Sequence, residues 1–155
     1  MRDADNTGTG TTGTGKAGTG PSNVKGRSLI SATMQLDRET GSGNFIRSYS
    51  AGELRINDAL FTNHVIVSAD DIIENWSPAI ISELSIADFS VAIRSHPELI
   101  IFGTGIEQIF PPAHVMTDIL RQGIGFEVMD TAAACRTFNV LAGERRRIAA
   151  ALMLR

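Results

Sequence analysis

The chain has 155 residues, 43% of them hydrophobic, and a formal net charge of -3 at pH 7. This length suits one ordinary domain with a single core, and mild acidity with scattered basic residues excludes the electrostatic footprint of a nucleic-acid-binding protein. No apolar run approaches the roughly 20 residues that span a bilayer, and a single cysteine excludes a disulfide within one chain.

Residues 1–27 form a segment rich in glycine and threonine. They have almost no apolar side chains whose burial could offset the entropy of ordering, so we expect a disordered tail before a single α/β domain over residues 28–155. Two matches to the dinucleotide pattern G-x-G-x-x-G, at residues 8–13 and 13–18, are explained by this composition alone. No strand precedes them, so they do not indicate a nucleotide site.

The first residues also bear on the compartment of the protein. Asp3 and Asp5 lie where a signal or transit peptide would be basic and apolar, and one cysteine fits a reducing compartment. We therefore expect a cytoplasmic protein, or one of the mitochondrial matrix were the chain eukaryotic.

Short apolar runs separated by turn-forming residues open the domain. They lie at residues 45–49, 53–56, 59–61 and 64–67. Runs of this length with Gly, Asn, Asp and Thr between them predict an antiparallel meander.

The second half alternates helix-like and strand-like patterns. Helical spacing of apolar residues predicts helices at about 86–95, after Pro112 as far as Gly123, and from Asp130 or Thr131 onward. The helix after Pro112 would bury Val115, Met116, Ile119 and Leu120.

Three strands are expected between and after these helices. Residues 99–102 form a continuous apolar run, as in a strand covered on both faces. Residues 124–128 alternate, and residues 148–154 favour a strand over a short helix. The order of these helices and strands along the chain predicts an α/β fold, a three-layer sandwich with a helix-covered mixed sheet and an additional N-terminal antiparallel β layer.

Three segments carry a resemblance to a known family. They are Arg47–Gly52, Gly103–Gly105 with Phe110–Pro111, and above all Glu127–Leu141. The chain from about residue 45 to 154 resembles the family of mitochondrial respiratory complex I assembly factor 3, although Gly143-Glu144-Arg145 departs from the family's usual glycine after the glutamate. The resemblance implies this three-layer fold and a non-enzymatic role as an interaction or complex-assembly module with a protein partner. Because the first residues do not resemble a mitochondrial transit peptide, we expect a bacterial homologue of the family.

The loop after the buried strand is the first candidate site. Strand carboxyl ends and helix N-termini converge there in open α/β sheets, so a ligand or partner pocket is expected at Gly103, Thr104, Gly105, Thr131, Cys135 and Asn139. The alternative function is therefore a small-molecule-binding protein or an enzyme that uses this pocket. Gln108 stands where a third glycine would complete a dinucleotide motif, so no dinucleotide is assigned. The structural interpretations are favoured over a pocket: a turn for the glycines, an inert buried cysteine, and a buried hydrogen-bond network for Asn139 and Thr131.

The other candidate is the basic cluster Arg145, Arg146 and Arg147. Three charges fall short of a nucleic-acid patch, and they form either a solvated turn or a contact with an acidic partner or with phospholipid headgroups, which would make the protein a peripheral membrane protein. The three histidines are widely spaced, so no metal and no cofactor are assigned. Exposed edge strands of the meander leave a homodimer open.

Overall fold

The computed structural model describes residues 34–35 and 43–155, and the tail expected at residues 1–27 lies outside them. A central five-stranded sheet has the strand order β7-β6-β10-β8-β9. Its strands are β6 (Val65–Ser68), β7 (Ile72–Ile73), β8 (Leu99–Thr104), β9 (Gly125–Met129) and β10 (Ile148–Met153). β10 pairs in parallel with β8, which pairs in parallel with β9, whereas β6 runs antiparallel to β10. The expected mixed sheet is confirmed.

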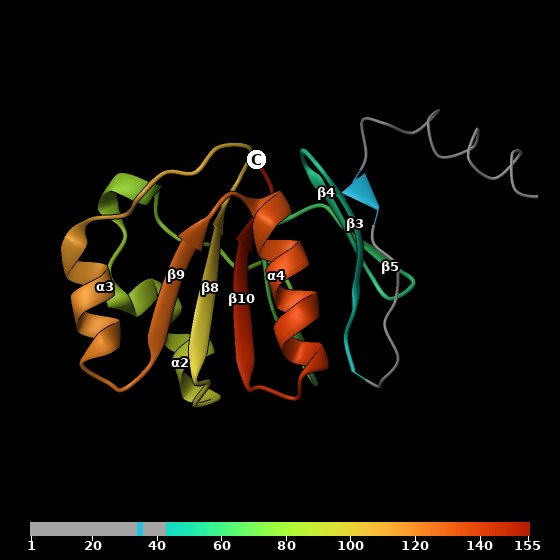
Figure 1. The fold of residues 1–155 in the computed structure, drawn as a ribbon. Coiled ribbons are helices and arrows are strands. Elements are labelled where there is room, and N and C mark those ends of the chain that lie inside the picture. The colour runs from blue at the N-terminus through green and yellow to red at the C-terminus, as the bar shows by residue number, and fades with distance from the viewer. Residues whose placement is uncertain (1–33, 36–42) are drawn as a thin grey trace, which may run out of the picture. The chain divides into compact units, whose positions relative to one another are not determined.

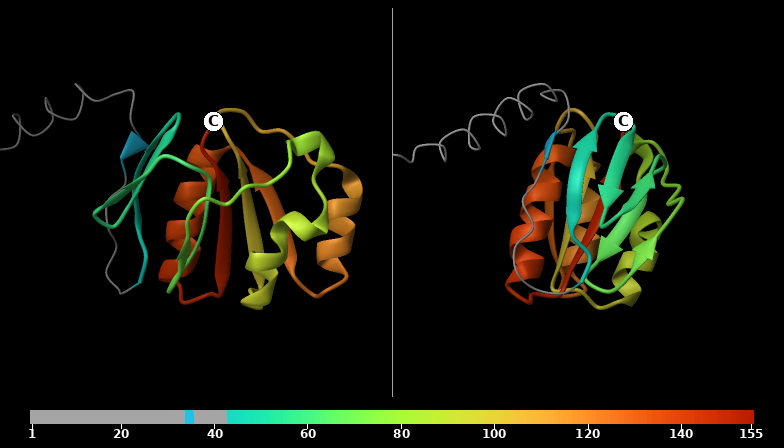
Figure 2. Two further views of the ribbon diagram at one scale, coloured as in Figure 1. Left: turned by 180° about the vertical axis from the view of Figure 1, so that it is seen from behind. Right: turned by 90° about the vertical axis from the view of Figure 1, so that its right-hand side faces the viewer.

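A second sheet has the order β2-β3-β4-β5 and is antiparallel. Its strands are β2 (Met34–Gln35), β3 (Ile46–Ser50), β4 (Glu53–Ile56) and β5 (Ala59–Phe61). It forms the additional β layer and lies beside β10 and α4 (Figures 1 and 2).

The position of β6 corrects the sequence-based prediction, which placed residues 64–67 in the meander. Val65, Ile66 and Val67 are all buried. A strand with apolar side chains on both faces needs cover on both sides, so β6 leaves the second sheet and pairs with β10, where Ala151 opposes Ile66.

Three helices and two 3-10 turns complete the described fold. The α-helices are α2 (Ser90–Arg94), α3 (Ala113–Leu120) and α4 (Thr131–Gly143), and the 3-10 turns span Ile81–Glu83 and Ile86–Phe89. α4 covers one face of the central sheet and α2 lies behind the opposite face (Figures 1 and 2). Asp130 caps α4, because its carboxylate accepts a hydrogen bond from the Ala133 N–H at 2.8 Å.

Two apolar cores lie on the two faces of the central sheet. One contains an aromatic cluster in which Phe89 meets Phe102 and Phe126 edge to face, with Trp76 beside them. The other joins α4 to the second sheet and includes Phe138, Ile46 and Leu54. On α3, Val115 and Ile119 are buried as expected, but Leu120 is 51% exposed, because it lies at the end of the helix beyond the packed face.

Candidate functional site

The loop that follows β8, which we call the glycine loop (Gly103–Gly105), is fixed to the start of α4 and to the end of β10. The Gly105 N–H donates to the Thr131 hydroxyl at 2.8 Å, and the Thr131 N–H donates to the Gly105 carbonyl at 2.9 Å. The Thr131 hydroxyl in turn donates to the carbonyl of Met153 at 2.6 Å. Gly105 has φ +97°, a conformation that favours glycine. The expected glycine turn therefore exists, and one buried threonine holds it.

Close packing surrounds Gly103. A Cβ atom at this position would lie 2.9 Å from the Thr131 hydroxyl oxygen and 3.1 Å from the Cβ of Ala134. Glycine is thus required because a strand and a helix approach closely here. Of the side chains that sequence analysis grouped at this point, Thr104 and Thr131 are both buried, and Thr131 packs directly beside Gly103.

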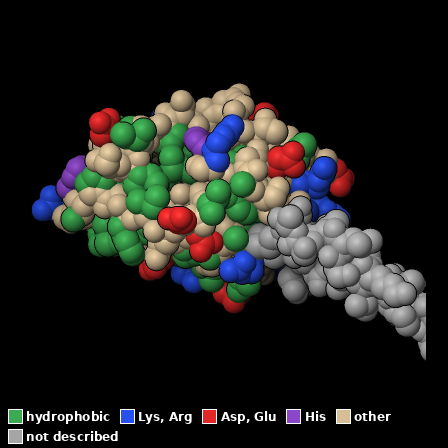
Figure 3. Space-filling model, turned by 90° about the horizontal axis from the view of Figure 1, so that it is seen from above, with side chains coloured by type: hydrophobic (Ala, Val, Ile, Leu, Met, Phe, Trp, Pro, Cys, Tyr) green, Lys and Arg blue, Asp and Glu red, His purple; other side chains and the backbone are tan. Residues whose placement is uncertain are grey.

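The part of the loop beyond Gly105 carries exposed apolar side chains. Thr104 anchors this part, because its hydroxyl donates to the Glu107 carbonyl at 2.5 Å and accepts from the Ile109 N–H at 3.1 Å. Gln108 donates its side-chain amide to the Val128 carbonyl at 2.9 Å. Ile106, Ile109 and Phe110 are nevertheless 67%, 47% and 65% exposed. We call these three residues the apolar loop; Figure 3 shows hydrophobic side chains exposed together on the face above the sheet.

The apolar loop was missed as a functional element by sequence analysis. The signal was present: three large apolar residues lie at helical spacing (i, i+3, i+4) between Gly105 and the pair Pro111-Pro112, in a segment too short to form a helix. Such residues have no regular element to bury them, and their number and fixed backbone set this loop apart from a lone exposed leucine.

Cys135 is fully buried in α4 and belongs to the core shared with the second sheet. Burial raises the pKa of its thiol well above the usual range, and the nearby positive charge of Arg136 offsets only part of this effect. A thiol that stays protonated is a poor nucleophile. The geometry therefore favours the inert, structural interpretation.

Asn139 lies one helical turn further along and bonds to the second sheet. Its side-chain oxygen accepts from the Ile46 N–H at 3.0 Å, and its amide donates to the Ile46 carbonyl at 2.9 Å. This pair fixes β3 to α4. Asn139 is thus separated from the glycine loop and borders a different cavity.

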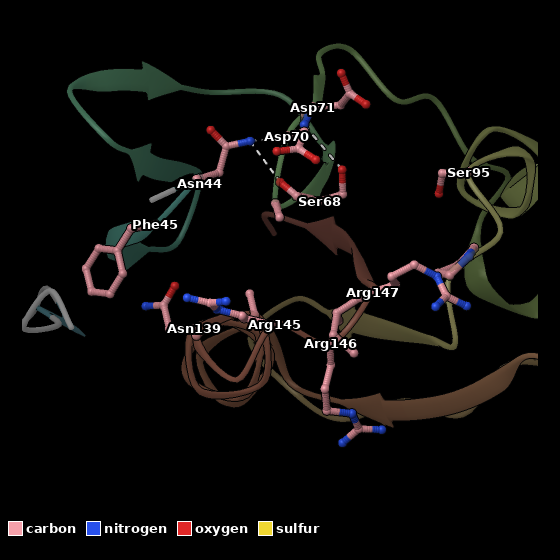
Figure 4. A pocket seen from close by; sticks show the side chains of 16 residues that line it. Asn44, Phe45, Ser68, Asp70, Asp71, Ser95, Asn139, Arg145, Arg146 and Arg147 are labelled. Atoms are coloured by element: carbon pink, nitrogen blue, oxygen red, sulfur yellow. Dashed lines mark hydrogen bonds between the residues drawn. The ribbon is translucent and has the colours of Figure 1, made fainter. Parts of the chain in front are cut away.

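That cavity contains the three arginines and has a volume of about 890 Å³. We call it the arginine cavity; its wall includes Ser68, Asp70, Asp71, Asn139, Arg145 and Arg147 (Figure 4). It lies at the end of the central sheet where β10 begins, opposite to the glycine loop.

Two of the three arginines already have partners. Arg146 forms an ion pair with Glu98 at 2.9 Å, which lowers the pKa of that carboxyl. Arg147 donates from its side-chain Nε to the His96 carbonyl at 3.3 Å. Within the described ranges, the Arg145 guanidinium makes no hydrogen bond or ion pair, so it is the free cation of the cluster.

The structure gives two further observations on the candidate chemistry. Among the residues described, no group of three His, Cys, Asp or Glu side chains could hold a metal ion. The helices of this part of the chain are all too short or too polar to cross a bilayer.

Fold and site together define a small three-layer α/β protein in which a rigid glycine loop presents apolar side chains to solvent. The chain belongs to the family described as "Protein of unknown function (DUF498/DUF598)", whose model matches residues 46–153.

Relatives of the chain are found in animals and bacteria. The chain is 32% identical to NADH dehydrogenase [ubiquinone] 1 alpha subcomplex assembly factor 3 of Danio rerio, over 76% of this chain and 68% of that protein. It is 27% identical to the 13 kDa major membrane protein of Francisella tularensis, over 67% of this chain and 85% of that protein. The resemblance to the assembly-factor family is confirmed.

Solved structures of several bacterial proteins share this fold. A crystal structure from Bordetella parapertussis has a TM-score of 0.68 and 26% identity, covering 76% of this chain and all of that one. An outer membrane protein from Bartonella henselae has a TM-score of 0.63 and 26% identity, covering 75% of this chain and 98% of that one.

Proposed function

We propose that this protein is an interaction module in the assembly of a membrane-bound protein complex, and that the apolar loop is its contact surface for a protein subunit. The observation that carries the proposal is the exposure of Ile106, Ile109 and Phe110 on a backbone anchored at Thr104 and Gln108. A surface that is rigid before binding loses little conformational entropy on association.

The kind of partner that would bind the apolar loop follows from the chemistry of the loop and from the names of the relatives. Large aliphatic and aromatic side chains are the usual centre of a protein interface, and Glu107 is the only charged residue between Gly105 and Pro112. A relative is named an assembly factor and two similar proteins are named membrane proteins. These names support a protein subunit of a membrane complex as the partner.

The proposal places the module in a reducing compartment such as the cytoplasm, where it would act on subunits before or during their insertion. The single cysteine is unpaired and buried, which suits such a compartment. The module would act without catalysis, because the loop offers shape and apolar area where an enzyme would need a nucleophile and a base.

The test is affinity purification of the tagged full chain from its native host, with mass spectrometry. The triple variant Ile106→Ser, Ile109→Ser, Phe110→Ser is compared with wild type, and the double variant Leu60→Ser, Ile80→Ser serves as the matched control on other exposed apolar residues. We expect subunits of one membrane-bound complex to copurify with wild type and control and to be lost from the triple variant.

Two outcomes would overturn the proposal. Equal recovery of those subunits by the triple variant would remove the loop from the interface. Binding of the purified wild-type protein to protein-free vesicles, lost in the triple variant, would make the loop a lipid contact.

A further inference from the structure

A second site lies in the arginine cavity, at the end of the sheet opposite to the apolar loop. Four separate segments build its walls: the turn between β6 and β7 with Asp70 and Asp71, the residues around Asn44 before β3, Ser95 and Pro97 after α2, and the end of α4 with the turn of Arg145–Arg147 before β10. Its volume of about 890 Å³ falls within the range typical of small-molecule sites.

The polar amides of the cavity wall are already used to hold the wall together. Asn44 donates its side-chain amide to the Ser68 carbonyl at 2.8 Å, which fixes the start of β3 to the end of β6. Asn139 uses both its oxygen and its amide on Ile46. These bonds fix the geometry of the cavity and leave recognition to other side chains.

The groups left over are charged and of both signs. In the parts of the chain that the structure describes, neither the Asp70 carboxylate nor the Arg145 guanidinium forms a hydrogen bond or an ion pair, although both face the same cavity. Figure 4 shows Asp70 on one side and Arg145, beside Asn139, on the other. Arg145 adopts φ +65°, an uncommon conformation for a residue other than glycine, asparagine or aspartate.

Opposite charges that line one cavity without pairing select against ligands of a single charge. A simple anion would be attracted by Arg145 and Arg147 but repelled by Asp70 and Asp71, and a simple cation would meet the reverse arrangement. A ligand with an ammonium group at one end and a carboxylate at the other satisfies both walls. Arginine suits the carboxylate, because its planar guanidinium can donate two parallel hydrogen bonds.

We propose that the arginine cavity binds an amino acid or a short unblocked peptide, with the ammonium group of the ligand at Asp70 and its carboxylate at Arg145. The site is separate from the apolar loop, so this binding does not depend on the proposed assembly role. The apolar part of the cavity wall, with Phe45 and Pro97, would contact the body of the ligand.

Calorimetric titration of the full chain tests the proposal with matched probes at up to about 10 mM. The probes are alanine and trialanine, which carry both charges, and N-acetyl-trialanine and trialanine amide, which each lack one. We expect at least one of the first two to bind, and each blocked peptide to bind about tenfold more weakly, as for the loss of one charged hydrogen bond. The comparison of alanine with trialanine measures the length of the ligand.

Two variants assign the ends of the ligand. Arg145→Gln should weaken the binding of trialanine about tenfold. Trialanine and trialanine amide should then bind equally well, whereas trialanine should still bind more tightly than the acetylated peptide. Asp70→Asn should do the opposite. Arg121→Gln and Asp58→Asn remove the same charges outside the cavity wall and should change nothing.

The proposal is overturned by any of three results. The first is that neither alanine nor trialanine binds in the range tested. The second is that the acetylated peptide binds as tightly as trialanine, which would indicate a site for anions alone. The third is that the two control variants weaken binding as much as Arg145→Gln and Asp70→Asn. Asp70 and Arg145 are both exposed, so circular dichroism of the variants should match wild type.

Discussion

Thr131 and Gly105 form two hydrogen bonds with each other, one through the Thr131 hydroxyl at 2.8 Å and one through the Thr131 N–H at 2.9 Å. Since the same hydroxyl also donates to Met153 at 2.6 Å, one side chain connects the loop after β8, the first turn of α4 and the end of β10. The position of the apolar loop therefore depends on Thr131, although Thr131 is fully buried and cannot touch a partner.

Replacement of Thr131 by valine should destabilise the protein by about 3 kcal/mol, because the Gly105 N–H and the Met153 carbonyl would each lose a buried partner. Valine keeps the shape of threonine, so packing changes little. Urea denaturation measures the free energy of unfolding, and Thr117→Val on the exposed side of α3 is the control. A loss equal to that of the control would show that the Thr131 hydroxyl contributes little to stability.

Gly103→Ala should destabilise the fold by about 1–3 kcal/mol through overpacking. The new Cβ would lie 2.9 Å from the Thr131 hydroxyl oxygen, and the neighbouring strand and helix can move little. Gly143→Ala is the matched control, since a Cβ there meets nothing within 4 Å and helical alanine is preferred to glycine. In thermal unfolding, the melting temperature of Gly103→Ala should fall below that of wild type, and that of Gly143→Ala should rise above it. Similar melting temperatures for the two variants would contradict the packing argument.

Local sequence pattern was sufficient for most elements of the fold and failed where pairing is long-range. The runs at 53–56 and 59–61 became β4 and β5 because turns hold neighbouring strands together. Residues 64–67 follow the same local pattern, but β6 pairs with β10, more than 80 residues away. The unbroken apolar run at 65–67 was the sequence signal for a strand covered on both faces, as the run at 99–102 was for β8.

The candidate sites were predictable to different degrees. The glycine loop was located because glycine after a buried strand marks a constrained turn, yet the exposed side chains beyond it were not recognised. The arginine cavity could not be predicted in full, since Asp70 and Arg145 lie 75 residues apart and only the fold places them around one space. No spacing rule links a strand-end turn to a helix-end turn.

Cys135 should react slowly with iodoacetamide in the native protein and rapidly in urea. Its thiol is fully buried, and burial raises its pKa, so little thiolate is present and access requires opening of the fold. Mass spectrometry of the alkylated fraction over time gives the rate. Thr131→Val should accelerate the reaction, because a less stable α4 opens more often. Rapid labelling of native wild type would show instead that this core is accessible.

His64 should make stability depend on pH near the ordinary histidine range. Its side-chain Nδ1 accepts a hydrogen bond from the Leu154 N–H at 3.0 Å, and burial, with a smaller effect of Arg155, lowers its pKa. The unfolded chain binds the proton more readily than the fold, so the stabilising contribution is complete above about pH 6.5 and is lost as the pH falls below that value.

The variant His64→Asn tests this assignment, because the asparagine side-chain oxygen can accept the same hydrogen bond but does not titrate. Urea denaturation at a series of pH values from 8 down to about 5 should show a steeper loss of stability for wild type than for His64→Asn. His114→Asn on exposed α3 is the control and should follow wild type. Parallel curves for wild type and His64→Asn would contradict the assignment, because protonated His64 carries a proton on Nδ1 and could no longer accept the hydrogen bond from the Leu154 N–H.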